Sequence, residues 1–327
     1  MPPFSVGGDF ECLTKNGKMS CWGQEPHWPS YEFKKVAKPQ KPQQVLPAGK
    51  IVGALSAPGK ICAVMEKNLE ILCWGLFGEL SSQPKQPQKI TGLKGTLQGL
   101  YATTAWFAVT SEGLFAFGGA RTKDSTVAKA VKNAPTDLIG HGGALQETVK
   151  PLPHLSVDKK GRLHSFSVAD KTGLVKYEGE GPKFGKPVIF LARVSNENCV
   201  LLKGGVARCW LGKPEAPYTL VADDGKSELK ALRAVASSES QICAINKERR
   251  LACGPKNPGA IGYPIKVKAL AEVAKEVALT LQGAGTTLCA TFKSGAVWCG
   301  GRNYEGQLGR GTFASGVEPQ PWGPVVF

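Results

Sequence analysis

The sequence predicts an all-β fold, a closed seven-bladed β-propeller with four-stranded blades. One pattern of apolar run, polar turn and second apolar run occurs seven times in 327 residues, at intervals of 43 to 52 residues. Such a period is typical of propeller blades. The 40 Gly and 23 Pro favour many short strands joined by turns over long helices. We expect residues 1–327 to form a single domain of seven repeats of about 47 residues each.

Each copy of the pattern is a β-hairpin signal. The seven copies lie at 11–23, 61–75, 106–118, 154–167, 198–212, 242–255 and 288–301. A patch of small residues before the hairpin suits an innermost strand, where blades converge. An extended segment after the hairpin supplies a fourth, outer strand. Two stretches, 227–236 and 270–279, also have a helical period. Both fall where the repeat predicts strands and connections, so we expect no long helix in either.

The two ends of the chain predict how the ring closes. The chain starts with an inner-strand pattern at 4–8 and finishes with an outer-strand pattern at 321–327. We therefore expect 317–327 to complete the blade begun at 1–23. The ring would then be closed by pairing of the C-terminal strand with the N-terminal strands.

The ten cysteines fall one on each strand of five hairpins, and the other two hairpins carry none. Random placement on the fourteen positions would give full pairing in about 2% of cases. Facing positions on neighbouring strands are close enough for a bridge. The pattern favours five cross-strand disulfides over reduced, buried thiols: Cys12-Cys21, Cys62-Cys73, Cys199-Cys209, Cys243-Cys253 and Cys289-Cys299.

Disulfides imply an oxidising compartment, so we expect a secreted or periplasmic protein. The N-terminus has no basic segment followed by an apolar run, and we expect this chain to lack a leader. No apolar run approaches the length of a membrane-spanning helix.

The last repeat, 289–312, resembles the repeat of the regulator of chromosome condensation family, whose members are seven-bladed propellers. The segment 303–309 (NYEGQLG) carries the Gly-Gln-Leu-Gly loop of that family, and 75–80 (GLFGEL) is a partial copy. The family's namesake binds chromatin and promotes nucleotide exchange on a small GTPase. The resemblance therefore implies a nucleotide-exchange effector as the lowest-ranked function, although no exchange residue is matched in this sequence.

No local motif of catalysis is present: there is no Gly-x-Ser-x-Gly elbow, no P-loop and no His-Glu-x-x-His. Asp223-Asp224 lies in a turn, where a solvated acidic pair is the default interpretation. His154 and His164 flank one hairpin and are expected to face each other as a packing or pH-sensitive pair. There is no Cys-x-x-Cys and the four His are scattered, so we expect no metal site and no cofactor. The sequence favours a binding module over an enzyme.

The connections that follow the hairpins are long and carry aromatic and cationic side chains, the usual composition of interface anchors. The candidate partner-binding residues are Trp28, Tyr31, Phe33, Lys34, Lys35, Phe77, Arg121, Lys123, Lys213, Tyr218, Arg302 and Tyr304. Trp22, Trp74 and Trp210, at the hairpin ends, are expected to pack within the blades. Trp106, before its hairpin, suits either role.

With 41 Lys+Arg against 26 Asp+Glu, the formal net charge is +15. Such a balance favours an acidic partner. The first choice is a protein partner bound through the loop face of the propeller, and the alternative is an anionic glycan or cell-envelope polymer. We expect no nucleic-acid partner, no membrane span and a monomer.

Overall fold

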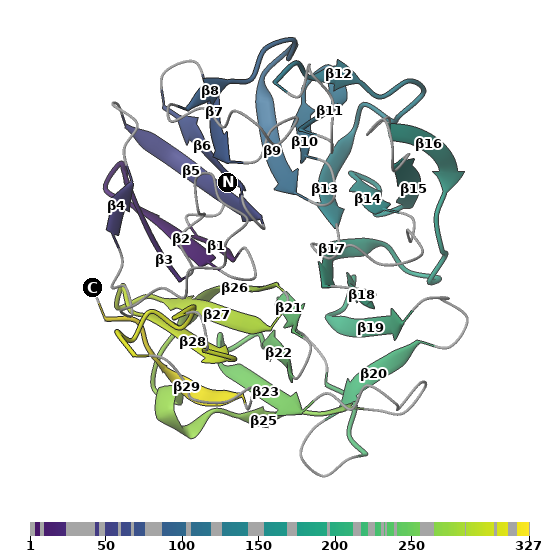
Figure 1. The fold of residues 1–327 in the computed structure, drawn as a ribbon. Helices are drawn as coiled ribbons and strands as arrows, with labels where there is room; N and C mark the ends of the chain where they lie inside the picture. Colours follow the sequence, from purple (N-terminus) through teal and green to yellow (C-terminus); the bar gives the residue numbers. More distant parts are fainter. Residues whose placement is uncertain are drawn as a thin grey trace.

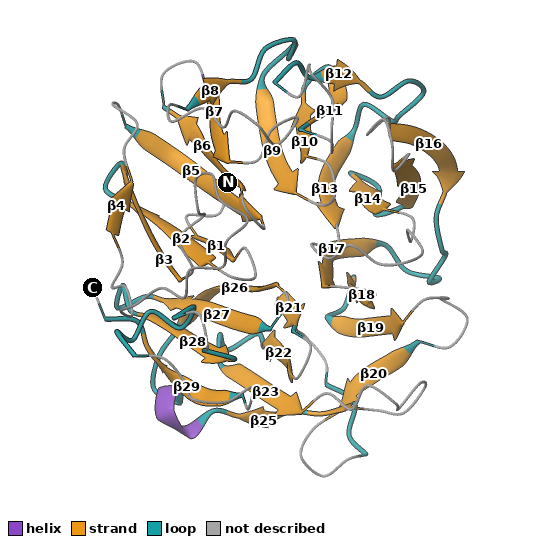
Figure 2. Ribbon diagram, viewed as in Figure 1, coloured by secondary structure: helices purple, strands orange, loops and turns teal. Residues whose placement is uncertain are grey.

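The computed structural model is a ring of β-sheets that surrounds a central axis (Figure 1). The structure describes residues 4–6, 10–23, 43–45, 50–57, 60–66, 69–75, 87–102, 106–118, 126–142, 154–168, 175–194, 197–211, 217–221, 226–229, 232, 234–238, 241–255, 265–284, 286–303, 306–312 and 319–326. Nearly all regular structure in these residues is strand, as Figure 2 shows, with one short 3₁₀ helix, η2 (Ala271–Val273).

The first four sheets each contain four consecutive strands joined antiparallel. Sheet 1 contains β1 (Phe4–Val6), β2 (Phe10–Lys15), β3 (Lys18–Gly23) and β4 (Gln43–Val45). Sheet 2 contains β5 (Ile51–Ala57), β6 (Lys60–Met65), β7 (Ile71–Gly75) and β8 (Gln88–Lys89). Sheet 3 contains β9 (Leu97–Ala102), β10 (Trp106–Thr110), β11 (Gly113–Phe117) and β12 (Lys129–Ala130). Sheet 4 contains β13 (Leu138–Gly142), β14 (His154–Asp158), β15 (Leu163–Val168) and β16 (Val175–Glu180).

The last three sheets keep this order, and one of them gains an extra strand. Sheet 5 contains β17 (Val188–Val194), β18 (Glu197–Leu202), β19 (Val206–Leu211), β20 (Tyr218–Val221) and β24 (Ile265–Lys266). Sheet 6 contains β21 (Ala234–Ser237), β22 (Gln241–Ile245), β23 (Leu251–Pro255) and β25 (Lys268–Ala269). Sheet 7 contains β26 (Ala278–Ala284), β27 (Thr287–Phe292), β28 (Val297–Gly301) and β29 (Gln320–Pro324).

The architecture is thus an all-β propeller of four-stranded antiparallel blades, in which the first strand of each sheet lies nearest the axis (Figure 1). The fifth strand of sheet 5 arises because β24 pairs parallel with β20 of that sheet before the chain continues into β25 of sheet 6. The stretches with a helical period at 227–236 and 270–279 contain β21 and η2 instead of long helices.

All five predicted disulfides are present, and the described residues contain no free cysteine. Each joins directly facing residues of the second and third strands, as in the pair Cys12↔Cys21. The Cα atoms are 4.1 Å apart in every bridge. This spacing is close to that of a non-hydrogen-bonded antiparallel pair, whose side chains approach most closely.

Each disulfide lies at the interface between its own sheet and the next one. Cys12, for example, packs in one cluster with Ile51 and Ile61 of sheet 2. Cys62 and Cys73 of sheet 2 likewise pack against Trp106 of sheet 3. Seven such clusters of buried side chains occur, and each joins two sheets that are neighbours in the ring.

The two hairpins without cysteine fill the same position with apolar side chains. Phe107 faces Ala116 in sheet 3, and Leu155 faces Ser165 in sheet 4. Phe107 is fully buried in a cluster that includes Phe166 of sheet 4. Larger side chains therefore occupy the interface volume that a disulfide fills elsewhere, which preserves the packing density that protein interiors require.

The predicted closure of the ring is wrong. β29 pairs with β28, with Trp298 facing Pro324, so 320–324 completes the last sheet and not the blade begun at 1–23. β4 already pairs with β3, with Met19 facing Val45, and so occupies the edge that was assigned to the C-terminal strand.

Side-chain packing joins sheet 7 to sheet 1. Leu13 and Trp22 form one buried cluster with Leu308, Val325 and the Cys289–Cys299 bridge. The Nε1–H of Trp22 donates a hydrogen bond of 3.0 Å to the carbonyl oxygen of Gln307. The interface between the last and the first sheet is therefore built like the others, with a disulfide facing apolar side chains.

The Gly-Gln-Leu-Gly segment forms part of this interface. The backbone N–H of Leu308 donates to Oδ1 of Asn303, while Nδ2 of Asn303 donates to the carbonyl oxygen of Thr312. Gly309 has a φ of +62°, and a Cβ there would lie 2.7 Å from Cγ1 of Val325. Only glycine fits this approach without strain, so the family-like loop has a packing role in this chain.

We predict that denaturing reduction adds ten hydrogens to the intact mass, because five disulfides are present. Each bridge closes a loop of 9 to 11 residues and should contribute about 2.5–3 kcal/mol to the free energy of unfolding in the chain-entropy model. Mass spectrometry with peptide mapping measures both the count and the pairing. Ten alkylated thiols in protein prepared under oxidising conditions would contradict the prediction.

We also predict that Leu308→Ala lowers the free energy of unfolding by about 2–5 kcal/mol, because Leu308 is fully buried where sheets 7 and 1 meet. Leu279→Ala is the matched control, since that leucine is 49% exposed, and it should change stability by less than about 0.5 kcal/mol. Urea unfolding measures both values. Equal losses would show that the packing of Leu308 does not hold the ring together.

Candidate interaction surfaces

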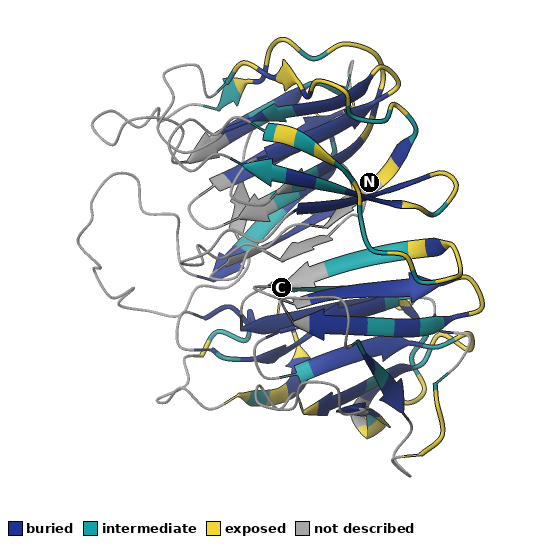
Figure 3. Ribbon diagram, turned by 90° about the vertical axis from the view of Figure 1, so that its right-hand side faces the viewer, coloured by how far each residue is buried: buried dark blue, intermediate teal, exposed yellow. Residues whose placement is uncertain are grey.

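The antiparallel order of the strands divides the connections between the two faces of the ring. The turn face carries the hairpin turns between second and third strands and the links from each outer strand to the next inner strand. The loop face carries the connections from first to second strand and from third to outer strand. Figure 3 shows the ring edge-on, with buried strands in the middle and many exposed residues along one side.

Two of the candidate partner-binding residues can be placed. The prediction for Tyr218 is wrong: it lies in β20, is 6% exposed and packs with Val235 and Ile242 between sheets 5 and 6. A strand position that faces the next sheet is committed to the core and cannot anchor a partner. Arg302 follows β28 and is half-buried, and its backbone N–H donates to the carbonyl oxygen of Thr286.

The other candidates lie outside the described residues and stay predictions: Trp28, Tyr31, Phe33, Lys34, Lys35, Phe77, Arg121, Lys123, Lys213 and Tyr304.

The tryptophans expected to pack do so where they can be followed. Trp22 and Trp210 are 3% and 2% exposed, and Trp106 is 1% exposed in the cluster between sheets 2 and 3. The side chain of Trp74 lies outside the described residues.

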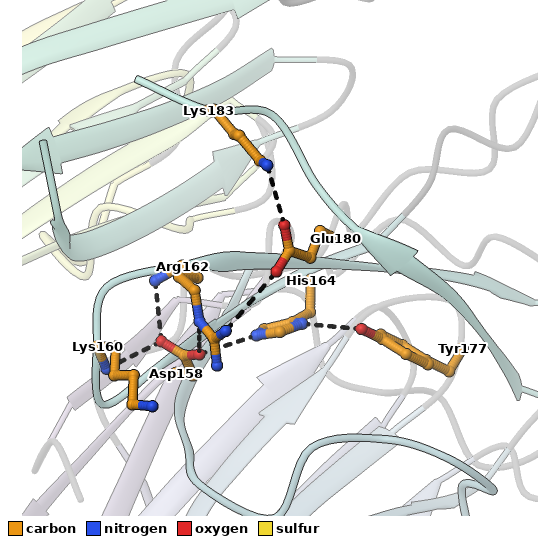
Figure 4. A network of polar contacts seen from close by, with 7 residues as sticks. All are labelled: Asp158, Lys160, Arg162, His164, Tyr177, Glu180 and Lys183. Atoms are coloured by element: carbon orange, nitrogen blue, oxygen red, sulfur yellow. Dashed lines mark hydrogen bonds and ion pairs between the residues drawn. The ribbon is translucent and has the colours of Figure 1, made fainter. Parts of the chain in front are cut away.

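The most extensive polar network in the described residues centres on Asp158, at the end of β14 in sheet 4 (Figure 4). Oδ1 of Asp158 accepts hydrogen bonds of 2.9 Å from the backbone N–H groups of Lys160 and Arg162. Oδ2 accepts from Nε of Arg162 at 2.7 Å and contacts Nε2 of His164 at 3.1 Å. The Nδ1 atom of His164 lies 3.1 Å from the hydroxyl of Tyr177. The network thus connects the second, third and outer strands of one sheet.

The network continues toward the surface through a second carboxylate. Glu180 lies 3.7 Å from Nη1 of Arg162 and 3.3 Å from Nζ of Lys183 (Figure 4). Asp158 is fully buried and His164 is 3% exposed, whereas Glu180 is half-exposed. Arg162 therefore lies between the buried carboxylate of Asp158 and the half-exposed carboxylate of Glu180, which Lys183 also contacts.

Burial of the Asp158 carboxyl raises its pKa, but the hydrogen bonds from Arg162 and His164 and the charge of Arg162 outweigh burial and hold the pKa below its usual value. The carboxylate that results accepts a hydrogen bond from Nε2 of His164, so this nitrogen carries a proton. Both oxygens of Asp158 are already engaged by two donors each. The arrangement closes the hairpin turn and leaves no free base.

The expected pairing of His154 with His164 does not occur. The strand register places Phe166 opposite His154 and Ser156 opposite His164. The ring of His154 instead packs 5.9 Å from that of Phe107 in sheet 3. The turn sequence from Asp158 to Arg162 was the available signal for the network, because a carboxylate at the start of a tight turn commonly caps the following backbone N–H groups.

Comparison with known proteins identifies the fold and no family. No family model matches the chain, and no curated protein matches it in sequence. Among solved structures, YCF48 from Cyanidioschyzon merolae aligns with a TM-score of 0.54 at 10% identity, over 90% of this chain and 94% of that one. The CRINKLY WD40 ectodomain of the Arabidopsis thaliana receptor kinase ACR4 aligns with a TM-score of 0.51 at 13% identity, over 91% and 93%. Both support the propeller.

A regulator of chromosome condensation protein, Prp20p from Saccharomyces cerevisiae, is also among the similar structures. It aligns with a TM-score of 0.47 at 12% identity, over 98% of this chain and 75% of that one. No helix in the described part of the chain is long and apolar enough to span a membrane.

We predict that Asp158→Asn lowers the free energy of unfolding by about 1–3 kcal/mol at neutral pH, because the amide keeps the shape but loses the charge that binds Arg162 and His164. A folded pKa below the unfolded value of about 3.9 gives stability that is present above that value. This stability is lost as pH falls through the lower folded pKa, so wild type and variant should converge in acid.

Urea unfolding at neutral and acidic pH measures the difference. Glu112→Gln is the control, since Glu112 is exposed and should show almost no difference at either pH. A loss for Asp158→Asn that is the same at both pH values would mean that the carboxylate charge contributes nothing.

Proposed function

We propose that the chain is a single-domain, closed seven-bladed propeller that acts as a non-enzymatic binding module. Its first-choice partner is an acidic protein bound through the loop face. The proposal rests on how the sheets pack: the broad surfaces of each sheet are buried against its neighbours in the ring. The seven buried clusters of the described residues occupy the space between neighbouring sheets, so the two faces and the outer rim of the ring are the surfaces left for a partner.

The polar network of sheet 4 supports a binding module over an enzyme. A general base needs a lone pair that can reach a substrate proton. Asp158 is buried and its oxygens are engaged, and both ring nitrogens of His164 have partners within the same sheet. Asp158 and His164 therefore stabilise the hairpin of sheet 4 and its contact with the outer strand.

The five disulfides support a protein of an oxidising compartment. We propose a secreted or periplasmic location and a monomeric state. The net charge of +15 would then steer an acidic partner toward the ring, which affects association rate more than final affinity.

The second candidate is an anionic glycan or envelope polymer, which the same charge favours. The two candidates differ in what supplies the affinity. A protein partner depends on rigid aromatic anchors. A polymer partner depends on charge neutralisation, so its affinity falls steeply with salt.

We predict that alanine at Trp28, Tyr31 or Phe77 weakens binding of a protein partner by at least about 1–2 kcal/mol each. Partners captured from secreted or periplasmic fractions are purified, and their direct binding is measured by calorimetry at low and high salt. Lys89→Gln, on the outer strand β8, is the matched surface control and should leave affinity unchanged. Silent aromatic variants, together with a salt-sensitive interaction with anionic polymers, would favour the second candidate.

A further inference from the structure

The turn face is held in place by backbone hydrogen bonds that cross from one sheet to the next. The N–H groups of Ile51, Val188 and Ala278 each donate at 2.9 Å to a carbonyl in the hairpin turn of the preceding sheet. The acceptors are Gly17, Gly161 and Arg249 respectively. These residues open the innermost strands of sheets 2, 5 and 7, so short, hydrogen-bonded turns form this face around the axis.

The second residue of the innermost strand lies at a β-bulge in sheets 2, 3, 4, 5 and 7. In sheets 4, 5 and 7 the strand register shifts at Ile139, Ile189 and Leu279. A bulge leaves one residue without a partner across the ladder and redirects its side chain. These three side chains are 48%, 51% and 49% exposed. Three of the five exposed large apolar residues in the described chain thus recur at one structural position around the axis.

Lysines surround these positions on the same face. Nine of them, all exposed, lie in or beside the connections of the turn face and form no ion pair with another described residue: Lys18, Lys94, Lys132, Lys159, Lys160, Lys186, Lys203, Lys275 and Lys293. They come from sheets 1, 4, 5 and 7 and from four of the links between sheets.

Few carboxylates offset this charge. The paired carboxylates on the same face are Glu66, Glu70, Glu180 and Glu248, and their partners, Lys50, Lys89, Lys183 and Lys247, are not among the nine. Three further described carboxylates there make no ion pair: Glu112, Asp137 and Glu276. Among the described residues of the turn face, unpaired positive charge therefore exceeds unpaired negative charge.

We infer that the turn face docks on an anionic lipid membrane surface. The lysines would lie against the lipid phosphates, where a cationic side chain gains attraction that decays within a Debye length. Ile139, Ile189 and Leu279 would enter the boundary between headgroups and acyl chains, as the apolar residues of peripheral membrane proteins do. A face of short turns presents these two kinds of side chain to a flat surface at once.

The composition of the face favours a membrane over other anionic partners. Protein interfaces are depleted in lysine and depend on aromatic and arginine anchors. A soluble anionic polymer binds the lysines but gains nothing from exposed branched aliphatic side chains. An anionic lipid surface gains from both the point charges and the apolar side chains. The site lies on the face opposite the loops, so it is independent of the protein partner proposed above.

Flotation of the purified chain with phosphatidylcholine vesicles, with and without phosphatidylglycerol, tests this inference. We expect binding to the anionic vesicles only, weakened by salt. The variant Lys159→Gln, Lys160→Gln, Lys186→Gln and Lys203→Gln should lower the partition coefficient roughly several hundredfold, since each of the four lysines contributes roughly fivefold near the surface. The variant Ile139→Ser, Ile189→Ser and Leu279→Ser should lower it by about tenfold or more.

A rim variant is the matched control for net charge. Lys89→Gln, Lys129→Gln, Lys176→Gln and Lys268→Gln remove the same charge from the outer strands β8, β12, β16 and β25. This variant should float like wild type. Because all substituted positions are at the surface of the ring, thermal unfolding should be unchanged and is measured in parallel.

Three outcomes would overturn the inference. The first is the absence of flotation with anionic vesicles. The second is an equal loss in the rim and turn-face lysine variants, which would mean that net charge alone acts. The third is full flotation of the aliphatic variant combined with competition by a soluble sulfated polysaccharide, which would identify a polymer site. None of these outcomes bears on binding through Trp28, Tyr31 or Phe77, so failure here is distinct from failure of the proposed function.

Discussion

The structure depends on the pair of residues that faces across each hairpin and contacts the next sheet. Five of the seven pairs are disulfides, and the other two are Phe107 with Ala116 and Leu155 with Ser165. Each sheet of four short strands buries its flanks only by contact with its neighbours, as repeat architectures require. The disulfide links the two strands of the hairpin and also fills the interface with the next sheet. One local chemical feature therefore stabilises both the strand pair and the packing between sheets.

Sheet 4 shows how a hairpin without a disulfide is held. Asp158 closes the turn through two backbone N–H groups, and His164 and Tyr177 extend the connection to the outer strand. A buried carboxylate needs such full compensation, because an unpaired charge in the interior is costly. The polar network and the disulfides are therefore two solutions to the same structural requirement.

Since the flanks are used for packing, recognition is left to the two faces of the ring, and these differ in character. The turn face consists of short connections tied together by backbone hydrogen bonds, with exposed lysines and three exposed aliphatic residues at bulges. For the loop face, the sequence predicts aromatic and cationic anchors in the connections that follow the hairpins.

The sequence by itself determined the hairpins and the cysteine pairs, because those features depend on residues ten or so apart in the chain. It also marked Trp22 and Trp210 as buried, because bulky side chains at the hairpin ends are expected to pack, but the residues that bury them come from neighbouring sheets. Only the tertiary structure decided that Tyr218 belongs to the core, that β29 stays in the last sheet, and that Ile139, Ile189 and Leu279 are exposed. Outer strands such as β8 and β12 are two residues long and carry almost no periodic signal. Closure rests on contacts such as that between Trp22 and Gln307, which lie 285 residues apart, and no local pattern encodes a contact at that separation.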